Sequence, residues 1–212
     1  MGTMAKLPRG FYGVVDVTAG PGVVDRARWL AAELLAAGAA ILQVRVKKGG
    51  SGAFLEVARA VREVCTVPLV VNDRADIAIA AGADGIHLGQ DDLPLAAARA
   101  IAPGLFVGIS THSLAQAMAA AAAGADYLGF GPIYPTGTKE NPDPVVGVGQ
   151  LARVVAAVAP LPVVAIGGIT ADNAAPLVTS GAHAIAVITD LFDAPDIAAR
   201  ARAFKNLFER LA

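Results

Sequence analysis

A short fragment that begins with Gly-Ala and continues into an apolar run recurs four times along this 212-residue chain. The four copies begin at Gly38, Gly82, Gly124 and Gly181, which are 44, 42 and 57 residues apart. Each copy closes an alanine-rich stretch, and glycine suits the left-handed residue that follows a helix C-terminus. We therefore interpret each copy as the end of a helix followed by a β-strand. The chain is predicted to be built from repeated helix–strand units.

Four further apolar runs alternate with these copies, so that eight strands are predicted in all. These runs lie at 12–17, 68–71, 105–109 and 162–166. Helical stretches are predicted between the strands, at 24–37, 52–65, 74–81, 94–102, 113–123, 147–158, 171–180 and 195–210. Near-continuous apolar strands that alternate with helices are typical of a parallel sheet covered on both faces.

Eight such units in a chain of this length predict an α/β fold, a single (β/α)8 TIM barrel. We expect one domain over residues 1–212, with residues 1–10 as a flexible N-terminal extension. The alternative is a doubly wound open sheet, which would carry a glycine-rich phosphate turn after its first strand. The sequence at that point, Val17-Thr-Ala-Gly-Pro21, does not match G-x-G-x-x-G, so the barrel is favoured.

Composition argues against several classes of partner. The net charge is −1, so a nucleic-acid partner is not expected. No membrane span is expected, because the apolar stretch 154–169 is short and is interrupted by Pro160 and Pro162. The single cysteine, Cys65, excludes an internal disulfide, and the N-terminus lacks the apolar run of a secretory signal. We expect a cytoplasmic protein that acts on small molecules, and the sequence leaves open whether it forms a homo-oligomer.

Polar residues gather where the predicted strands end, and in (β/α)8 barrels this end carries the active site. Alternation along the second strand puts Gln43, Arg45 and Lys47 on one face. The other strand-end residues are Asn72 and Asp73, Gln90 to Asp92, Ser110 to His112, Thr136 to Lys139, Gly167 to Thr170, and Ile188 with Thr189.

Two of these residues are carboxylates at the ends of neighbouring strands. Asp73 ends the third strand and Asp92 follows the fourth. Neighbouring parallel strands lie roughly 5 Å apart, so the two carboxylates can share one divalent cation. Mg²⁺ takes only one or two protein carboxylates and completes its shell with water and substrate phosphates. The pair therefore predicts a Mg²⁺ site for diphosphate chemistry.

The last two strand ends resemble a phosphate cup. Many (β/α)8 barrels build such a cup from the loops after strands 7 and 8, where backbone N–H groups hold the anion. Gly167-Gly168 and Ile188-Thr189 occupy these positions. Together with the cations Arg45, Lys47 and Lys139, the cup indicates two phosphorylated ligands: a diphosphate on Mg²⁺ and a monophosphate on backbone amides.

Simpler interpretations exist for each group. Asp73 and Asp92 could cap the helices that follow them. Gln43, Arg45 and Lys47 could be a solvated strand end, and the two glycines only a tight turn. His87 lies within a strand and is interpreted as a hydrogen-bonded core residue, whereas His112 stands at a strand end where structural and functional roles are equally open. His183 lies at the opposite end of the barrel and is expected to have no function.

The sequence resembles thiamine-phosphate synthases from Tyr12 to about Leu191. Six pieces in order carry the resemblance: Gln43-Val-Arg-Val-Lys47, Asn72-Asp-Arg74, Gly85-Ile-His-Leu-Gly-Gln-Asp-Asp92, Gly108-Ile-Ser110, Gly129-Phe-Gly-Pro-Ile-Tyr-Pro-Thr-Gly-Thr-Lys139 and Ala165-Ile-Gly-Gly-Ile169. The resemblance implies a transferase that joins 4-amino-2-methyl-5-hydroxymethylpyrimidine diphosphate to 4-methyl-5-(2-phosphoethyl)thiazole, or to its carboxylated form. The products would be thiamine phosphate and pyrophosphate.

The resemblance also implies roles for individual residues. Asp73 and Asp92 would be the Mg²⁺ ligands, and Lys139, Arg45 and Ser110 the catalytic residues. The pyrimidine diphosphate would be surrounded by Gln43, Arg45, Lys47, Asn72, Ser110 and Lys139. The thiazole phosphate would be held by Thr136, Gly137, Thr138, Gly168, Ile188 and Thr189.

The implied reaction is dissociative: pyrophosphate departs first, and the thiazole nitrogen then attacks the pyrimidine methylene cation. Positive charges already in place would stabilise the departing group, and the 132–144 loop is expected to act as a lid that excludes water. One departure from the family lies near this chemistry: Thr189 stands where serine is usual, so that the hydroxyl is kept and a methyl is added.

Two competing functions are weighed against this one. A thiazole tautomerase on the same barrel would use His112 as a base, but it would have no need for Asp73, Asp92 and Lys139 together. A phosphate-binding protein without activity would be expected to have lost some of the charged positions, and none is lost.

Overall fold

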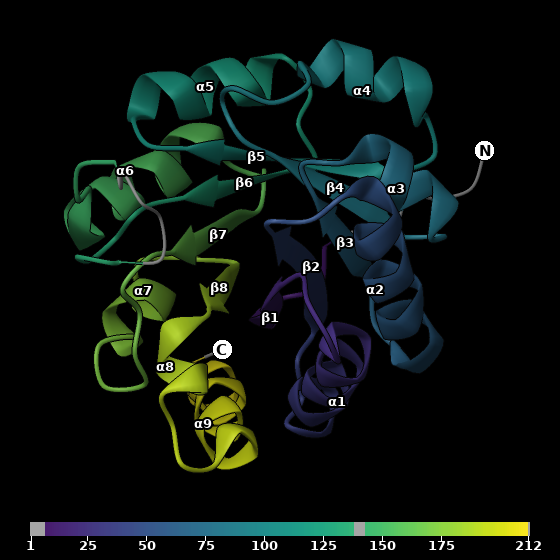
Figure 1. The fold of residues 1–212 in the computed structure, drawn as a ribbon. Helices are drawn as coiled ribbons and strands as arrows, with labels where there is room; N and C mark the ends of the chain where they lie inside the picture. The colour runs from purple at the N-terminus through teal and green to yellow at the C-terminus, as the bar shows by residue number, and fades with distance from the viewer. Residues whose placement is uncertain (1–6, 138–142, 212) are drawn as a thin grey trace.

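The computed structural model describes residues 7–137 and 143–211, and it forms a ring of strands surrounded by helices (Figure 1). The strands are β1 (Gly10–Thr18), β2 (Ile41–Lys47), β3 (Leu69–Asn72), β4 (Gly85–Leu88), β5 (Phe106–Thr111), β6 (Tyr127–Phe130), β7 (Val163–Ile166) and β8 (Ala184–Val187). The helices are α1 (Val23–Ala36), α2 (Ser51–Val64), α3 (Ala75–Ala80), α4 (Leu95–Ile101), α5 (Leu114–Ala122), α6 (Gly147–Val158), α7 (Ala175–Thr179), α8 (Thr189–Phe192) and α9 (Ile197–Arg210).

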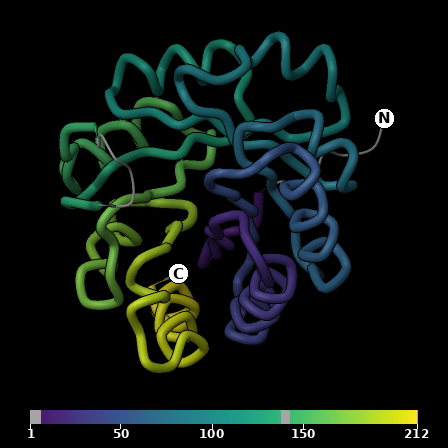
Figure 2. The backbone as a smooth tube through the Cα atoms, viewed as in Figure 1, coloured from purple at the N-terminus to yellow at the C-terminus, as the bar shows by residue number. Residues whose placement is uncertain are grey.

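The eight strands form one closed parallel barrel in chain order. Each strand pairs with the next, and β1 closes the ring by pairing with β8 from Gly10 opposite Ala184. The chain travels once around the ring, which brings α9 beside α1 (Figure 2). The predicted (β/α)8 barrel is confirmed, and the open sheet is excluded.

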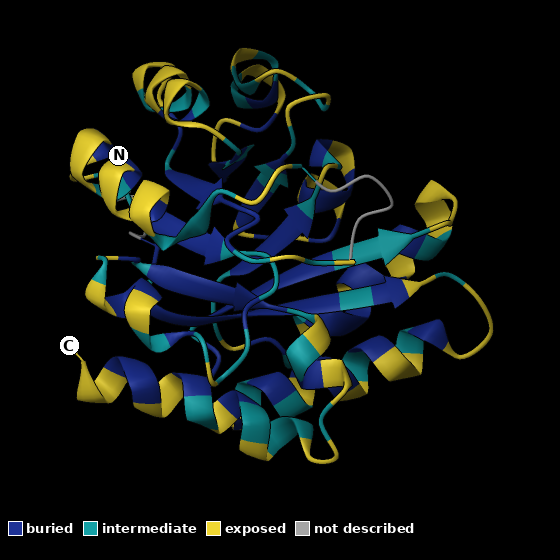
Figure 3. Ribbon diagram, turned by 90° about the vertical axis from the view of Figure 1, so that its left-hand side faces the viewer, coloured by how far each residue is buried: buried dark blue, intermediate teal, exposed yellow. Residues whose placement is uncertain are grey.

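Alternation along the strands separates two layers of side chains. Tyr12, Ile41, Val70 and Tyr127 belong to a buried cluster inside the barrel. The residues between them in sequence, such as Leu42, point outward and pack against the helices in a larger cluster. Buried strands therefore lie between helices whose outer faces are exposed (Figure 3).

The recurring Gly-Ala fragments perform the predicted backbone role. Gly38, Gly82, Gly124 and Gly181 have φ angles of 89°, 65°, 89° and 89°, all in the left-handed region that glycine tolerates best. Each follows a helix of the outer layer and precedes an inward turn to the next strand. This confirms the boundary that the repeats predict.

The first described residues of the chain differ from the sequence-based expectation in one respect. Residues 7–10 do not form the expected extension, because Leu7 is buried inside the barrel and Gly10 begins β1. His183 Nε2 lies 2.7 Å from the Leu7 carbonyl oxygen, which attaches this stretch to the start of β8. Residues 1–6 lie outside the described part of the chain.

The short helix α8 was not expected from the sequence, which predicts one helix after the last strand. α8 and α9 are joined by a bidentate ion pair between Asp190 and Arg200, at 2.7 and 2.8 Å.

Within the described residues no helix is long and apolar enough to cross a membrane.

Candidate active site

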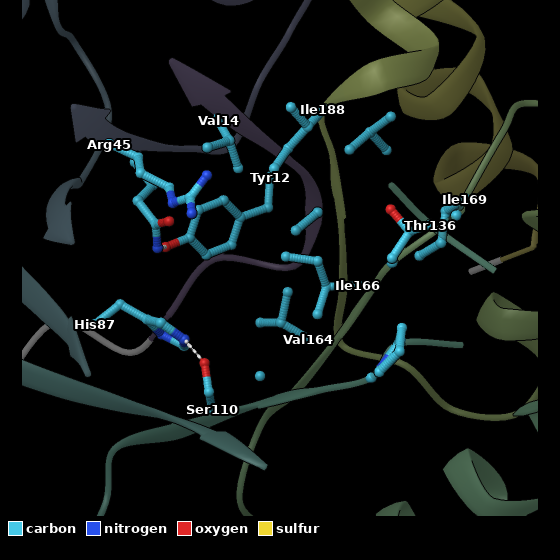
Figure 4. A pocket seen from close by; sticks show the side chains of 18 of the residues that line it. Tyr12, Val14, Arg45, His87, Ser110, Thr136, Val164, Ile166, Ile169 and Ile188 are labelled. Carbon is cyan, nitrogen blue, oxygen red and sulfur yellow. Dashed lines mark hydrogen bonds between the residues drawn. The ribbon is translucent and has the colours of Figure 1, made fainter. Parts of the chain in front are cut away.

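A cavity of about 750 Å³ opens at the carboxyl ends of the strands. It brings together most of the residues that the sequence predicts for the site: Gln43, Arg45, Asn72, Asp73, Asp92, Ser110, His112, Thr136, Gly137, Gly168, Ile188 and Thr189. Its inner wall is apolar and includes Val14, Val164 and Ile166 (Figure 4). Thr138 and Lys139 lie outside the described residues.

Lys47 lies beside the main cavity rather than in its lining. It lines a smaller hollow of about 360 Å³ together with Asp16 and Phe192. Gly137, Ile188 and Thr189 line both hollows, so the two are neighbours at the barrel mouth.

The two acids follow the ends of the neighbouring strands β3 and β4, and both line the cavity. The Asp73 amide donates to the His87 carbonyl at 2.8 Å, which ties the Asp73 backbone to the end of β4. The Gly89 amide donates to Asp92 Oδ2 at 2.7 Å. Gly89 directly follows Leu88, the last residue of β4, so this bond holds Asp92 at the end of β4. Both acids therefore belong to the junction between β3 and β4.

Helix capping does not explain this arrangement. The capping position of α3 is occupied by Arg74 and that of α4 by Pro94. Asp92 instead folds back onto Gly89, where an added Cβ would lie 2.9 Å from Asp92 Oδ2. Asp73 adopts the left-handed φ of 63°, which is uncommon outside glycine and is found at sites where structure and function constrain the backbone.

The donor set fits a hard divalent cation. Mg²⁺ ordinarily takes one or two carboxylates of the protein as ligands, and two are present at this rim. No group of three or more His, Cys, Asp or Glu side chains suited to a metal was found among residues 7–137 and 143–211.

The strand-end cations are held by an acid that the sequence analysis missed. Asp16 is 6% exposed and pairs with Arg45 at 3.2 Å and with Lys47 at 2.7 Å. Asp16 stands opposite Arg45 in the β1–β2 register. Its only sequence signal is a charged residue within an apolar strand, facing the inside of the barrel by alternation.

A second missed group is a pair of tyrosines in the floor of the cavity. Tyr12 and Tyr127 are fully buried, and their hydroxyl oxygens lie 3.1 Å apart. Burial raises the pKa of both phenols above the ordinary value, so both stay neutral. Gln43 Nε2 donates to the Tyr12 hydroxyl at 3.0 Å, which connects the tyrosines to a predicted site residue.

His87 is hydrogen-bonded at both ring nitrogens, as a core histidine would be. Nδ1 lies 2.8 Å from the Tyr127 hydroxyl, and Nε2 lies 2.8 Å from Ser110 Oγ. The ring nevertheless lines the cavity and points toward Ser110 (Figure 4). His87 therefore has the hydrogen-bonded ring expected from the sequence, and this ring also lines the cavity.

His112 joins the two ends of the 132–144 loop. Nδ1 contacts the Gly131 carbonyl oxygen, and Nε2 lies 3.3 Å from Asp143 Oδ2. The loop itself is described only outside 138–142, so the predicted lid falls partly outside the described residues. With both ring nitrogens occupied, His112 shows no feature that favours a role as a free base.

The expected phosphate cup is a tight, well-supported turn. Gly167 and Gly168 have φ angles of 97° and 64°, and an added Cβ on Gly168 would lie 2.4 Å from the Pro135 carbonyl oxygen. Asn173 holds the turn from below, accepting from the Thr170 amide at 2.8 Å and donating to the Gly168 carbonyl at 3.0 Å. The turn faces the same cavity as the carboxylates.

The fold and the site together define a (β/α)8-barrel enzyme whose cavity lies at the carboxyl ends of the strands. The family model described as thiamine monophosphate synthase matches residues 12–191, which are most of the chain. The chain belongs to the thiamine-phosphate synthase family.

Individual relatives agree with this membership. A thiamine-phosphate synthase of Methanospirillum hungatei is 45% identical over 202 residues, covering 93% of this chain and 97% of the relative. One from Methanoculleus marisnigri is 44% identical over 200 residues, covering 92% and 93%. A solved thiamine phosphate pyrophosphorylase from Pyrococcus furiosus superposes with a TM-score of 0.85 at 33% identity, covering 97% of each chain.

Proposed function

We propose that this enzyme joins 4-amino-2-methyl-5-hydroxymethylpyrimidine diphosphate to 4-methyl-5-(2-phosphoethyl)thiazole, or to its carboxylated form, and releases thiamine phosphate and pyrophosphate. The observation that carries the proposal is one cavity whose lining includes Asp73, Asp92 and Arg45 and also the Gly167-Gly168 turn. One phosphorylated ligand needs only one of these features, whereas two ligands need both.

The diphosphate end of the cavity is assigned to β2–β5. Arg45 offers a guanidinium that can bind phosphate oxygens in a bidentate manner, and Ser110 offers a hydroxyl donor nearby. Lys47 adds positive charge near the rim, and Lys139 is assigned to the same ligand from its sequence position alone. Asp73 and Asp92 would hold Mg²⁺, which when bound supplies fixed positive charge to the diphosphate oxygens.

The reaction needs no nucleophile from the protein. The bond between the pyrimidine methylene carbon and the diphosphate oxygen breaks, and its electron pair leaves with pyrophosphate. The thiazole nitrogen then gives its lone pair to the methylene carbon. Arg45 acts by a charge that is in place before the bond breaks, so that little reorganisation is required, and Lys139 is assigned the same role from its sequence position.

The remaining task is to position the thiazole and exclude water. The turn at Gly168, together with Thr136, Ile188 and Thr189, is assigned to the phosphate of the thiazole. Val164 and Ile166 line the cavity with apolar surface, which disfavours water near the pyrimidine methylene cation. The cavity volume of about 750 Å³ lies within the range of small-molecule sites.

The test is a turnover assay with both substrates, in which thiamine phosphate and pyrophosphate are each quantified. We expect equal amounts of the two products with Mg²⁺ and none after chelation by EDTA. Isomerisation of a thiazole substrate without metal would instead support the tautomerase. Binding of both ligands without turnover would support the inactive binding protein.

A further inference from the structure

The cavity floor contains a chain of five hydrogen-bonding side chains that we call the relay: Gln43, Tyr12, Tyr127, His87 and Ser110. Successive members are separated by 3.0, 3.1, 2.8 and 2.8 Å. The relay crosses the inside of the barrel, since its members come from β2, β1, β6, β4 and β5. It begins and ends at residues that line the cavity.

The direction of donation along the relay follows from its first link. Gln43 donates to the Tyr12 oxygen, and Tyr12 has one proton, which can only go to Tyr127 among its described partners. Tyr127, having accepted this bond, donates to His87 Nδ1. An imidazole that accepts at Nδ1 and is neutral carries its proton on Nε2, so His87 donates to Ser110 Oγ. The Ser110 proton then remains for a group in the cavity.

Two glycines in the barrel wall leave room for the rings of the relay. A Cβ on Gly108 would lie 2.0 Å from Tyr127 Cζ, and a Cβ on Gly129 would lie 2.9 Å from His87 Cε1. Both glycines stand within strands, where glycine weakens pairing and often marks a close approach. The lack of a side chain at these positions of β5 and β6 therefore leaves space for the rings of Tyr127 and His87.

We propose that Tyr127 and His87 are positioning residues that fix the polarity of Ser110, so that its hydroxyl is presented as a hydrogen-bond donor to the diphosphate. The inference rests on the proposed function for the identity of that ligand. In the opposite polarity, Ser110 would donate its proton to His87. An oxygen lone pair of Ser110 would then face the anionic diphosphate. Fixing the proton order before binding avoids that repulsion.

The first experiment reads the proton order directly in the ligand-free protein. The chain has three histidines, so ¹⁵N labelling of histidine gives three ring systems to assign. Because Tyr127 donates to Nδ1, we expect a proton on Nε2 of His87 and none on Nδ1. A proton on Nδ1, or on both nitrogens, would overturn the relay.

Tyrosine variants test the links. Tyr127→Phe keeps the ring and removes the donor to Nδ1, so the bias toward the Nε2–H form should fall. Tyr12→Phe cuts the relay one step earlier and should lower the bias if Tyr127→Phe does not fold. The matched control is Tyr134→Phe, which removes the remaining tyrosine hydroxyl of the chain; this hydroxyl donates to the Asn173 carbonyl instead. A His87 tautomer that is unchanged in both relay variants would contradict the proposal.

Binding of pyrophosphate in the presence of Mg²⁺ tests the consequence for Ser110. Loss of a hydrogen bond to a charged group corresponds to a decrease in affinity of about tenfold or more. We expect this decrease for Ser110→Ala and for Tyr127→Phe, but no further decrease when both changes are combined. If Tyr127 acted only through overall structure, the two effects would add, and the proposal would fail.

The two readouts separate this proposal from the proposed function. If the parent protein does not bind pyrophosphate with Mg²⁺, the proposed function is contradicted, and with it the target of the Ser110 hydroxyl. The tautomer of His87 would still show whether the relay has the proposed proton order. If the parent binds and turns over normally but His87 carries its proton on Nδ1, only the relay is wrong.

Discussion

Single residues of this site are held in place by hydrogen bonds and ion pairs to neighbouring residues. Asp16 holds Arg45 and Lys47, and the Gly89 amide holds the Asp92 carboxylate. The outer residues were predicted from their positions at strand ends. Asp16, Tyr12 and Tyr127 were not, because each lies within an apolar run whose pattern indicates core. A polar atom in such a run requires a partner, and this requirement is the signal that could have found them.

Asp92 is the residue at which the metal assignment can be tested with least disturbance. Asp92→Asn keeps an oxygen that can accept from the Gly89 amide and removes the negative charge. We expect Mg²⁺-dependent binding of pyrophosphate to fall by at least about tenfold, as the loss of a charged ligand requires, while binding of the thiazole phosphate changes little. Titration calorimetry of both ligands measures this.

The control for Asp92→Asn is Asp25→Asn, which removes the same charge from an exposed side chain on α1. It should leave both affinities unchanged. Normal turnover in Asp92→Asn would show that the metal assignment is wrong.

Lys139 is assigned to the leaving group from sequence alone. Lys139→Ala should lower kcat by roughly 10²-fold or more, because a charge contact that stabilises the departing pyrophosphate is lost. Steady-state kinetics measures the change, and Lys205→Ala on α9 serves as control. A rate equal to that of the parent protein would remove Lys139 from the leaving-group site.

The buried tyrosines predict how stability changes with pH. The pKa of Tyr12 and of Tyr127 is raised from 10.0 by burial. Below pH 10 the folded and unfolded states both keep these protons, so these groups do not alter stability. As the pH rises above 10, the unfolded state loses protons that the folded state retains, and the free energy of unfolding falls.

Urea titrations at several pH values between 9 and about 11 measure this dependence. The decrease in the free energy of unfolding should be less steep in Tyr12→Phe than in the parent protein. Equal slopes in the two proteins would contradict the raised pKa of Tyr12.

At the scale of helices and strands, most of the fold could be predicted. The four recurring Gly-Ala fragments locate β2, β4, β6 and β8, because a left-handed glycine marks each of these boundaries locally, and apolar runs locate the other strands. The expected helix over 195–210 agrees with α9 to within two residues at its start. The helix α8 was missed because its four residues carry no periodic pattern, and it depends on contacts with α9.

The ion pair between α8 and α9 should contribute measurably to stability. Arg200→Lys cannot form both bonds to Asp190, a carboxylate that is 8% exposed. The free energy of unfolding should fall by about 1–3 kcal/mol, the cost of a lost hydrogen bond to a charged group. Urea unfolding measures it, with Arg202→Lys at an exposed position of α9 as control. Equal stability of Arg200→Lys and the parent would show that the pair contributes nothing.

At the scale of the whole molecule, closure of the barrel brings the site together. Asp73 and Asp92 are 19 residues apart in the sequence, and the Gly167-Gly168 turn is distant from both, yet all line one cavity. Sequence position at strand ends predicts this convergence. It could not predict that Lys47 lies in the neighbouring hollow, because that depends on its ion pair with Asp16.

The central claim is that Asp73 and Asp92 hold one hard cation together with a diphosphate. The most direct measurement is a crystal structure with Mn²⁺ and pyrophosphate, in which anomalous scattering locates the ion. We predict one ion bound by both carboxylates and by pyrophosphate oxygens. An ion bound by neither acid, or each acid on a separate ion, would contradict the claim.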